Sequence, residues 1–210
     1  MAVRRVLTLP KYEKVLRRKS QPVKSVDRSV RNLIRDLRDT LDKQEGVGLA
    51  APQIGVLQRI CLVMRGTDQQ GEAEEGTEPE VIALINPEII DESEETERDY
   101  DGCLSIPGLQ GYTHRPTTLR VRALDEAGDT VEYLFEGFDA RVAAHELDHL
   151  DGILFLDRLS SLEELFYLVP DPEDEEKIKM LPYLEVHPEY RLMLTDRVGM
   201  PTRGVETIMG

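Results

Sequence analysis

The sequence is poor in aromatic residues and cysteine, and its acidic residues far outnumber its basic ones. It contains no tryptophan, 5% aromatic residues and two cysteines in 210 residues, and its formal net charge is −15. So few cysteines argue against a disulfide-dependent secreted domain and favour a reducing cytoplasm. The acidic balance argues against a broad nucleic-acid binder, because binding to phosphates requires a basic surface. No apolar run approaches the roughly 20 residues that a membrane-spanning helix needs, so we expect no membrane segment.

The remaining composition is that of a soluble globular protein, with 40% hydrophobic and 32% charged residues. The length predicts one domain, or one domain with a tail. The basic leader contains Pro10 and Glu13 and has no small-residue cleavage site, so we expect it to belong to the mature fold. Cys61 lies in the apolar stretch RICLVM, which predicts an inert thiol on a buried strand.

The hydrophobic pattern predicts an α+β fold with antiparallel sheets around a central helix. A first amphipathic helix is expected over 26–41, with Ser25 as its N-cap, and a second helix over 138–150, stopped by Gly152. Between these helices we expect an irregular loop over 45–55 and strands over 58–64 and 81–90, the second of which ends at Pro87. Exposed polar segments are expected over 65–80 and 91–102, and a hairpin is expected to pair 118–124 with 130–137. From about residue 170 the pattern fails, and 170–179 resembles a charged linker.

The second helix carries the motif His145-Glu146-x-x-His149. Histidines four residues apart lie on one face of a helix, so both imidazoles can reach one metal ion. Glu146 projects about 100° away, which suits a carboxylate that moves protons beside the metal. The alternative is a pair of solvated histidines in an acidic turn. The motif alone does not choose between a metalloprotease and another metal hydrolase.

A third metal ligand is expected from outside this helix. The segment after the motif offers only carboxylates (Asp151, Asp157, Glu163 and Glu164), whereas Cys103 lies upstream in DGCLS. A thiolate with two imidazoles would leave one coordination position open, as in catalytic metal sites. The alternative for Cys103 is a small buried hydrophobic residue.

Three segments, GVGLAAPQIG, DGCLS and HELDH, resemble in this order the motifs of the peptide deformylases. The resemblance covers about residues 4–160. It implies an α+β deformylase-like catalytic domain over 1–165, followed by an acidic extension over 166–210 of unknown role. The implied roles are metal ligands for Cys103, His145 and His149, general base and acid for Glu146, an oxyanion hole of Gln53 and Leu104, and substrate binding by Gly46, Val47, Gly48 and Gly102.

The resemblance also implies the reaction. Glu146 would take a proton from a water activated by the metal, the formyl group of an N-formylmethionyl nascent peptide would be attacked, and formate would leave. Iron(II) is the implied ion, with zinc, nickel or cobalt as alternatives. We expect a cytoplasmic monomer that reads no nucleic acid; docking to the ribosome cannot be inferred from the acidic tail. Gln53 could instead be a solvated loop residue, and the glycines could serve the backbone alone.

The chain departs from the family pattern at three positions. Asp101 replaces a glutamate, and we expect it to pair with Arg115; Ala144 replaces a glutamine, and Gln110 stands where many bacterial members have an arginine. These departures leave two rivals open, a zinc endopeptidase and a non-catalytic binding module. His114 and His187 are expected to have no catalytic role.

Overall fold

The computed structural model describes residues 2–68, 73, 76, 78–171 and 174–188. The chain divides into two compact units. Among the described residues, the first unit comprises 2–7, 11–68, 73, 76, 78–97 and 115–154, and the second comprises 8–10, 98–114, 155–171 and 174–188. Each unit is described by itself below.

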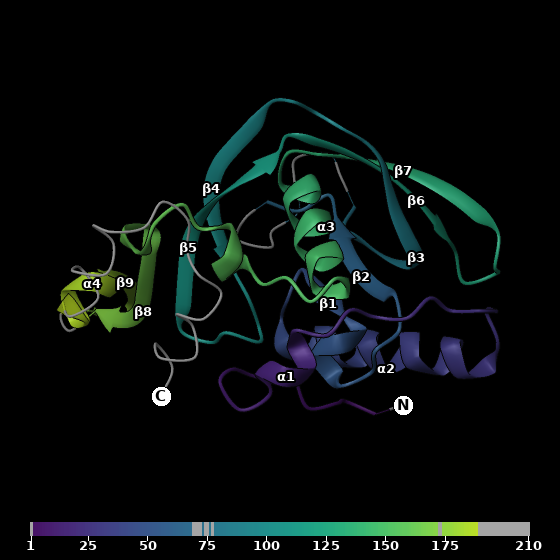
Figure 1. Cartoon of the computed structure of the whole chain (residues 1–210), viewed down its shortest axis with the longest axis horizontal. Helices are drawn as coiled ribbons and strands as arrows, with labels where there is room; N and C mark the ends of the chain where they lie inside the picture. The colour runs from purple at the N-terminus through teal and green to yellow at the C-terminus, as the bar shows by residue number, and fades with distance from the viewer. Residues whose placement is uncertain (1, 69–72, 74–75, 77, 172–173, 189–210) are drawn as a thin grey trace. The chain divides into compact units, whose positions relative to one another are not determined.

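The first unit is built on a five-stranded antiparallel sheet, and the hydrophobic core lies between this sheet and helix α3 (Figure 1). Helix α3 contacts the strand at each end of this sheet and the strand next to it, β1 and β2 at one end and β7 and β6 at the other. Its own small residues, together with Ala50 of the first strand, belong to the apolar cluster between them. In spatial order the strands are β1 (Gly48–Ala50), β2 (Ile60–Arg65), β3 (Glu80–Glu92), β6 (Thr118–Leu124) and β7 (Thr130–Glu136). The helices of this unit are α1 (Glu13–Leu16), α2 (Arg28–Gln44), the 3-10 turn η1 (Ala51–Ile54) and α3 (Gly137–Leu150).

Both predicted helices are confirmed, with a correction at the start of the first. The N-cap of α2 is Asp27, not Ser25, because the Asp27 carboxylate accepts the N–H groups of Ser29 and Val30 at 2.8 and 3.0 Å. This satisfies two of the donors that a helix start leaves unpaired. Gly152 follows α3 with a φ of 74°, as expected for a glycine beyond a helix end.

The predicted hairpin is confirmed, whereas the predicted end of the strand at Pro87 is wrong. β6 and β7 pair from Leu124 with Thr130 onward. β3 continues past Pro87 to Glu92, with an irregular register against β6 between Ile85 and Glu88. A bulge tolerates proline, because the missing N–H is not required for the ladder there. The expected loop over 45–55 also contains regular structure, β1 and η1.

The second unit contains a four-stranded sheet, in the order β4, β5, β8, β9. Two of its strands were not predicted from the sequence. β4 (Thr96–Gly102) lies in the acidic run for which only exposure was expected, and β9 (Asp174–Pro182) contradicts the linker expected there. Its other elements are β5 (Leu109–Pro116), β8 (Leu165–Asp171), the 3-10 turns η2 (Phe155–Arg158) and η3 (Leu162–Glu164), and α4 (Tyr183–Val186). Residues 189–210 of the predicted extension lie outside the described residues.

Candidate active site

The two histidines of the motif lie on α3 and are buried in the protein. His145 and His149 are 8% and 1% exposed, and every residue of α3 from Ala140 to Leu150 is buried. A helical segment with no exposed face is surrounded by protein, so the alternative of solvent-facing histidines is excluded. The two Nε2 atoms are 3.2 Å apart, with the rings inclined at 77°.

This separation fits two imidazoles that converge on one ion. Two nitrogen ligands at about 2.1 Å from a tetrahedral metal ion lie about 3.4 Å from each other. Cys103, His145 and His149 each offer one ligand atom, and these atoms all lie within 4.8 Å of one another. One sulfur and two nitrogens are a donor set for zinc, iron and other borderline ions, so the residues fit a divalent transition metal.

Cys103 directly follows the last residue of β4. Its side chain is half-buried and forms no disulfide. The Ser105 N–H donates to Sγ at 3.4 Å, and the Ile106 N–H donates to the Cys103 carbonyl at 2.9 Å. A tight turn thus holds the thiol, and the half-buried Leu104 belongs to the same turn.

The other cysteine, Cys61, is also a free thiol but lies in a different environment. Cys61 lies on β2 and is fully buried. Burial, followed by the negative charge of Glu146, raises the pKa of the Cys61 thiol well above its usual value. The predicted inert core thiol is therefore confirmed.

Glu146 lies against the backbone of β1. It is 3% exposed, and a Cβ atom added to Gly48 would lie 2.4 Å from Glu146 Oε1 and 2.9 Å from both Cδ and Cγ. No real Cβ contact is that short. Position 48 therefore accepts only glycine while Glu146 keeps this position, a reason that the sequence interpretation did not include.

Gln53 is a buried residue of η1, not a solvated loop residue. It is 1% exposed, and its Oε1 accepts the Ala50 N–H at 2.7 Å. Because the backbone N–H can only donate, this bond assigns the oxygen to one end of the amide, and the NH2 group forms the other end. Gly46 and Val47 precede β1 and border a cavity of about 440 Å³ that is also lined by Arg38, Leu41, Asp42, Glu45, Met64 and Val81.

Buried carboxylates lie in the chain beside two of the candidate ligands, His149 and Cys103. Arg115 donates to Asp148 at 2.6 Å, with side chains that are 4% and 10% exposed. Asp148 immediately precedes His149, so this ion pair fixes α3 beside a candidate ligand. Asp101, 5% exposed, accepts the Thr113 hydroxyl at 3.0 Å. The expected pairing of Asp101 with Arg115 stays a prediction.

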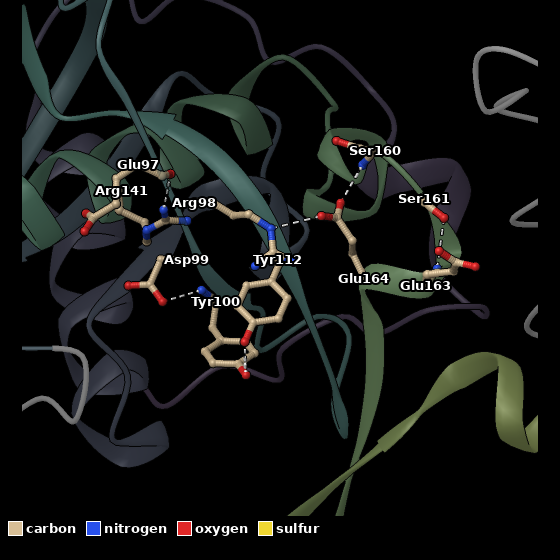
Figure 2. A network of polar contacts seen from close by, with 10 residues as sticks. All are labelled: Glu97, Arg98, Asp99, Tyr100, Tyr112, Arg141, Ser160, Ser161, Glu163 and Glu164. Carbon is tan, nitrogen blue, oxygen red and sulfur yellow. Dashed lines mark hydrogen bonds and ion pairs between the residues drawn. The ribbon is translucent and has the colours of Figure 1, made fainter.

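The sequence interpretation missed the supporting roles of Asp148, Thr113 and Arg141. Arg141 lies one turn before His145, is 4% exposed, and donates to the Glu97 carbonyl at 2.8 Å (Figure 2). The sequence contained a signal for the role of Arg141, because a charged residue four positions before His145 lies on the helix face that carries the histidines. His114 is exposed, as predicted.

The family profile described as "Polypeptide deformylase" matches residues 3–165. The chain belongs to the peptide deformylase family. The peptide deformylase of Thermomicrobium roseum is 45% identical over 175 residues, which are 83% of this chain and 96% of that protein. That of Natranaerobius thermophilus is 42% identical over 166 residues, 79% of this chain and 96% of that protein.

Solved peptide deformylases have the same fold. The crystal structure from Ehrlichia chaffeensis in complex with actinonin matches with a TM-score of 0.69 and 37% identity, covering 78% of this chain and 92% of that one. A Met-Ala-Ser-bound class I type b enzyme from Acinetobacter baumannii matches with a TM-score of 0.68 and 31% identity, over 75% and 99% of the two chains. The predicted family and α+β fold are thus confirmed.

Peptide deformylases are metal-dependent hydrolases of protein biosynthesis. They remove the N-formyl group from the formylmethionine of new polypeptides and release formate, and this is the function of the chain. No helix within the described residues has the length and apolar composition to cross a membrane.

Proposed function

We propose that this peptide deformylase holds one divalent metal ion with Cys103, His145 and His149 and hydrolyses the formyl amide beside it. The observation that carries the proposal is the convergence of the three ligand atoms to within 4.8 Å. When bound, the ion supplies a Lewis acid that lowers the pKa of water and polarises the formyl oxygen.

Glu146 moves the proton. Its carboxylate accepts a proton from the attacking water while the new C–O bond forms at the formyl carbon. It then gives that proton to the peptide nitrogen as the C–N bond breaks, which releases formate and a free amine. Glu146 suits this role because it is buried beside the histidines and held against the Gly48 backbone.

Gln53 and Leu104 stabilise the negative charge that develops on the formyl oxygen. The Gln53 carbonyl oxygen is already engaged by the Ala50 N–H, so the NH2 group is the end that donates to an oxyanion. The Leu104 backbone N–H, next to Cys103, is the second donor. Each such donor is worth about a hundredfold in kcat.

The substrate backbone pairs with strand edges. β1 and β4 are each at the edge of their own sheet, and an extended peptide can add to an edge as a further strand. Gly46, Val47 and Gly48 are proposed to contact it near β1, and Gly102 at the end of β4. The lack of side chains at Gly46 and Gly102 allows close approach.

We further propose iron(II) as the native ion, with zinc, nickel or cobalt able to replace it. Affinity alone favours zinc over iron(II), so the metal content of protein purified without oxygen is the deciding measurement.

Residues 1–165 are proposed to form the catalytic domain and residues 166–210 an extension. This division is supported by two relatives, almost the full length of which aligns with only about four fifths of this chain. The proposed setting is the cytoplasm, with a monomer acting on nascent peptides at the ribosome.

Formate release from a formyl-Met peptide tests the proposal. The wild-type protein should release formate, and Glu146→Ala should lower kcat by about 10²-fold to 10⁴-fold while it retains metal. Cys103→Ser should lose metal and activity together. An active Cys103→Ser variant would favour an endopeptidase with another ligand, and metal-loaded protein that releases no formate would favour a binding module.

A further inference from the structure

The first residues of the chain carry a charge opposite to that of the rest. Residues 2–24 contain eight of the 26 basic residues but only one of the 41 acidic ones, Glu13. They comprise the leader, α1 and the segment that follows α1 (purple in Figure 1). The net charge of −15 therefore conceals a local positive surface. Charges beyond about 8 Å are largely screened at physiological salt, so a partner at this surface responds to the local charge.

Main-chain hydrogen bonds fix this segment on the first unit. Before α1, the Leu7 N–H donates to the Gln53 carbonyl at 2.7 Å. After α1, the Ser20 N–H donates to the Leu150 carbonyl at 2.8 Å. The segment is thus attached on both sides of α1. A partner meets side chains whose backbone is already ordered, which lowers the entropic cost of binding.

Carboxylates neutralise only part of this positive charge. Arg17 pairs with Glu13 at 3.6 Å, and Lys19 pairs with Asp151 at 2.9 Å. Asp151 also pairs with Arg59 at 2.9 Å, so its charge is shared. Within the part of the chain that the structure describes, four exposed cations of the segment have no ion pair: Arg5, Lys11, Lys14 and Arg18.

Two of these four cations share one aromatic ring. Arg5 Cζ lies 5.4 Å from the centroid of the Tyr12 ring, and Lys11 Nζ lies 5.3 Å from the same centroid. Attraction between a cation and a ring holds both charges there. Residues from the leader and from the start of α1 therefore form one positive surface.

The other two cations lie on the outer side of α1. Lys14 is two positions before Leu16, and Arg18 is two positions after it. Two positions correspond to about 200° around a helix, so both side chains point away from the face that Leu16 buries. Lys14 is also one helical turn from Lys11, which extends the surface along the segment.

The chemistry of this surface favours a polyphosphate as its partner. A membrane surface is bound by helices with an exposed apolar face, whereas the apolar Leu16 of α1 is buried. Dispersed carboxylates of another protein add little, because exposed ion pairs contribute only about 0–1 kcal/mol each. A nucleic acid differs, because cations that bind its phosphates release condensed counterions. At the proposed setting of the enzyme, the ribosome, the abundant polyphosphate is RNA.

We propose that Arg5, Lys11, Lys14 and Arg18 form a docking surface for the phosphate backbone of RNA. Contacts to phosphates carry no sequence information, so this surface reads no bases. It would hold the enzyme where formylated chains emerge. The inference rests on the proposed setting at the ribosome and is independent of the metal site.

The test follows the binding of a labelled RNA duplex of about 16 base pairs to the full chain by fluorescence anisotropy, over a range of salt concentrations. Four phosphate contacts should make log Kd rise with log salt with a slope of about 3 to 4. The triple variant Lys11→Gln, Lys14→Gln, Arg18→Gln should lower this slope to about 1 and weaken binding at low salt by about tenfold or more. Its kcat/KM for a free formyl-Met peptide should be unchanged.

The matched control is Lys43→Gln, Arg120→Gln, Lys179→Gln, which removes three exposed cations elsewhere and should bind RNA as the wild type does. Equal losses in both triple variants, or a wild-type slope near zero, would overturn the docking surface. It is also overturned if anionic phospholipid vesicles bind as tightly as RNA, or if polyglutamate at equal charge displaces the RNA. Protein that releases no formate yet binds RNA through these residues supports the docking surface alone.

Discussion

Gly48→Ala is predicted to inactivate the enzyme through a single displaced side chain. The added methyl group would lie 2.4 Å from Glu146 Oε1, and all three of its nearest heavy atoms belong to the Glu146 side chain. Favourable contacts begin at about 3.5 Å, so the carboxylate must move by about 1 Å. β1 cannot yield easily, because Gly48 is paired in register with Val63 of β2.

The magnitude follows from the role of Glu146. A catalytic group that is misplaced by about 1 Å costs on the order of a hundredfold in rate. Removal of the base altogether costs about 10²-fold to 10⁴-fold, which sets the upper limit. Overpacking of the buried contact should also lower the free energy of unfolding by about 1–3 kcal/mol. Metal content should be preserved, because the clash involves no metal ligand.

A double-mutant cycle isolates this cause. Formate release is measured for the wild type, Gly48→Ala, Glu146→Ala and the double variant, with metal content as a check. In the Glu146→Ala background the clashing atoms are gone, so Gly48→Ala should have almost no further effect on kcat. An equal loss from Gly48→Ala in both backgrounds would refute the reasoning, as would a single variant with full kcat.

Three further predictions concern stability. Hydrogen bonds from the Ser29 side chain and the Val30 N–H lower the pKa of the Asp27 carboxyl below its usual 3.8, so its stabilisation is present above that pH and is lost as pH falls through the lowered value. Asp27→Ala should therefore lower Tm at pH 7 and lower it progressively less as the pH falls below 3.8, whereas Asp27→Asn should show a weaker dependence on pH. Arg115→Met should destabilise the metal-free protein by about 3–5 kcal/mol in urea, because it leaves Asp148 buried without this charge, and adding Asp148→Leu should restore part of the loss. Gly152→Ala should cost about 3 kcal/mol in the same assay, because its Cβ would lie 2.4 Å from the Arg17 carbonyl oxygen at a φ of 74°; a loss below 1 kcal/mol would contradict this.

The sequence predicted the elements whose cause is local. The hairpin is recognisable because alternating residues flank a turn in which Asp125 accepts three backbone N–H groups, those of Ala127, Gly128 and Asp129. The two helices are recognisable from apolar spacing over several turns. The metal motif is recognisable because both histidines lie in one helix, so their relative geometry follows from four residues of spacing.

The elements that were missed depend on pairing between distant segments. β4 has an acidic sequence typical of a loop, and it is a strand because β5 supplies its hydrogen-bond partners. β9 likewise pairs with β8 through residues expected to form a linker. Strand propensity reflects the neighbours of a segment more than the segment itself, so composition alone did not predict β4 and gave the wrong assignment for β9.

Gly48 and Gly102 have different tasks that their sequence contexts do not distinguish, since each lies in a motif that the family resemblance implicates in the site. A Cβ at position 48 would strike the Glu146 carboxylate, the proposed general base, whereas a Cβ at position 102 would meet only an ordinary contact with Gln110. The first glycine therefore makes room for Glu146, and substitution should affect every substrate alike through kcat. The second lies on the proposed path of the peptide, so substitution should act mainly through KM. Steady-state kinetics of the two alanine variants thus separate a glycine required by the protein from one required by its substrate.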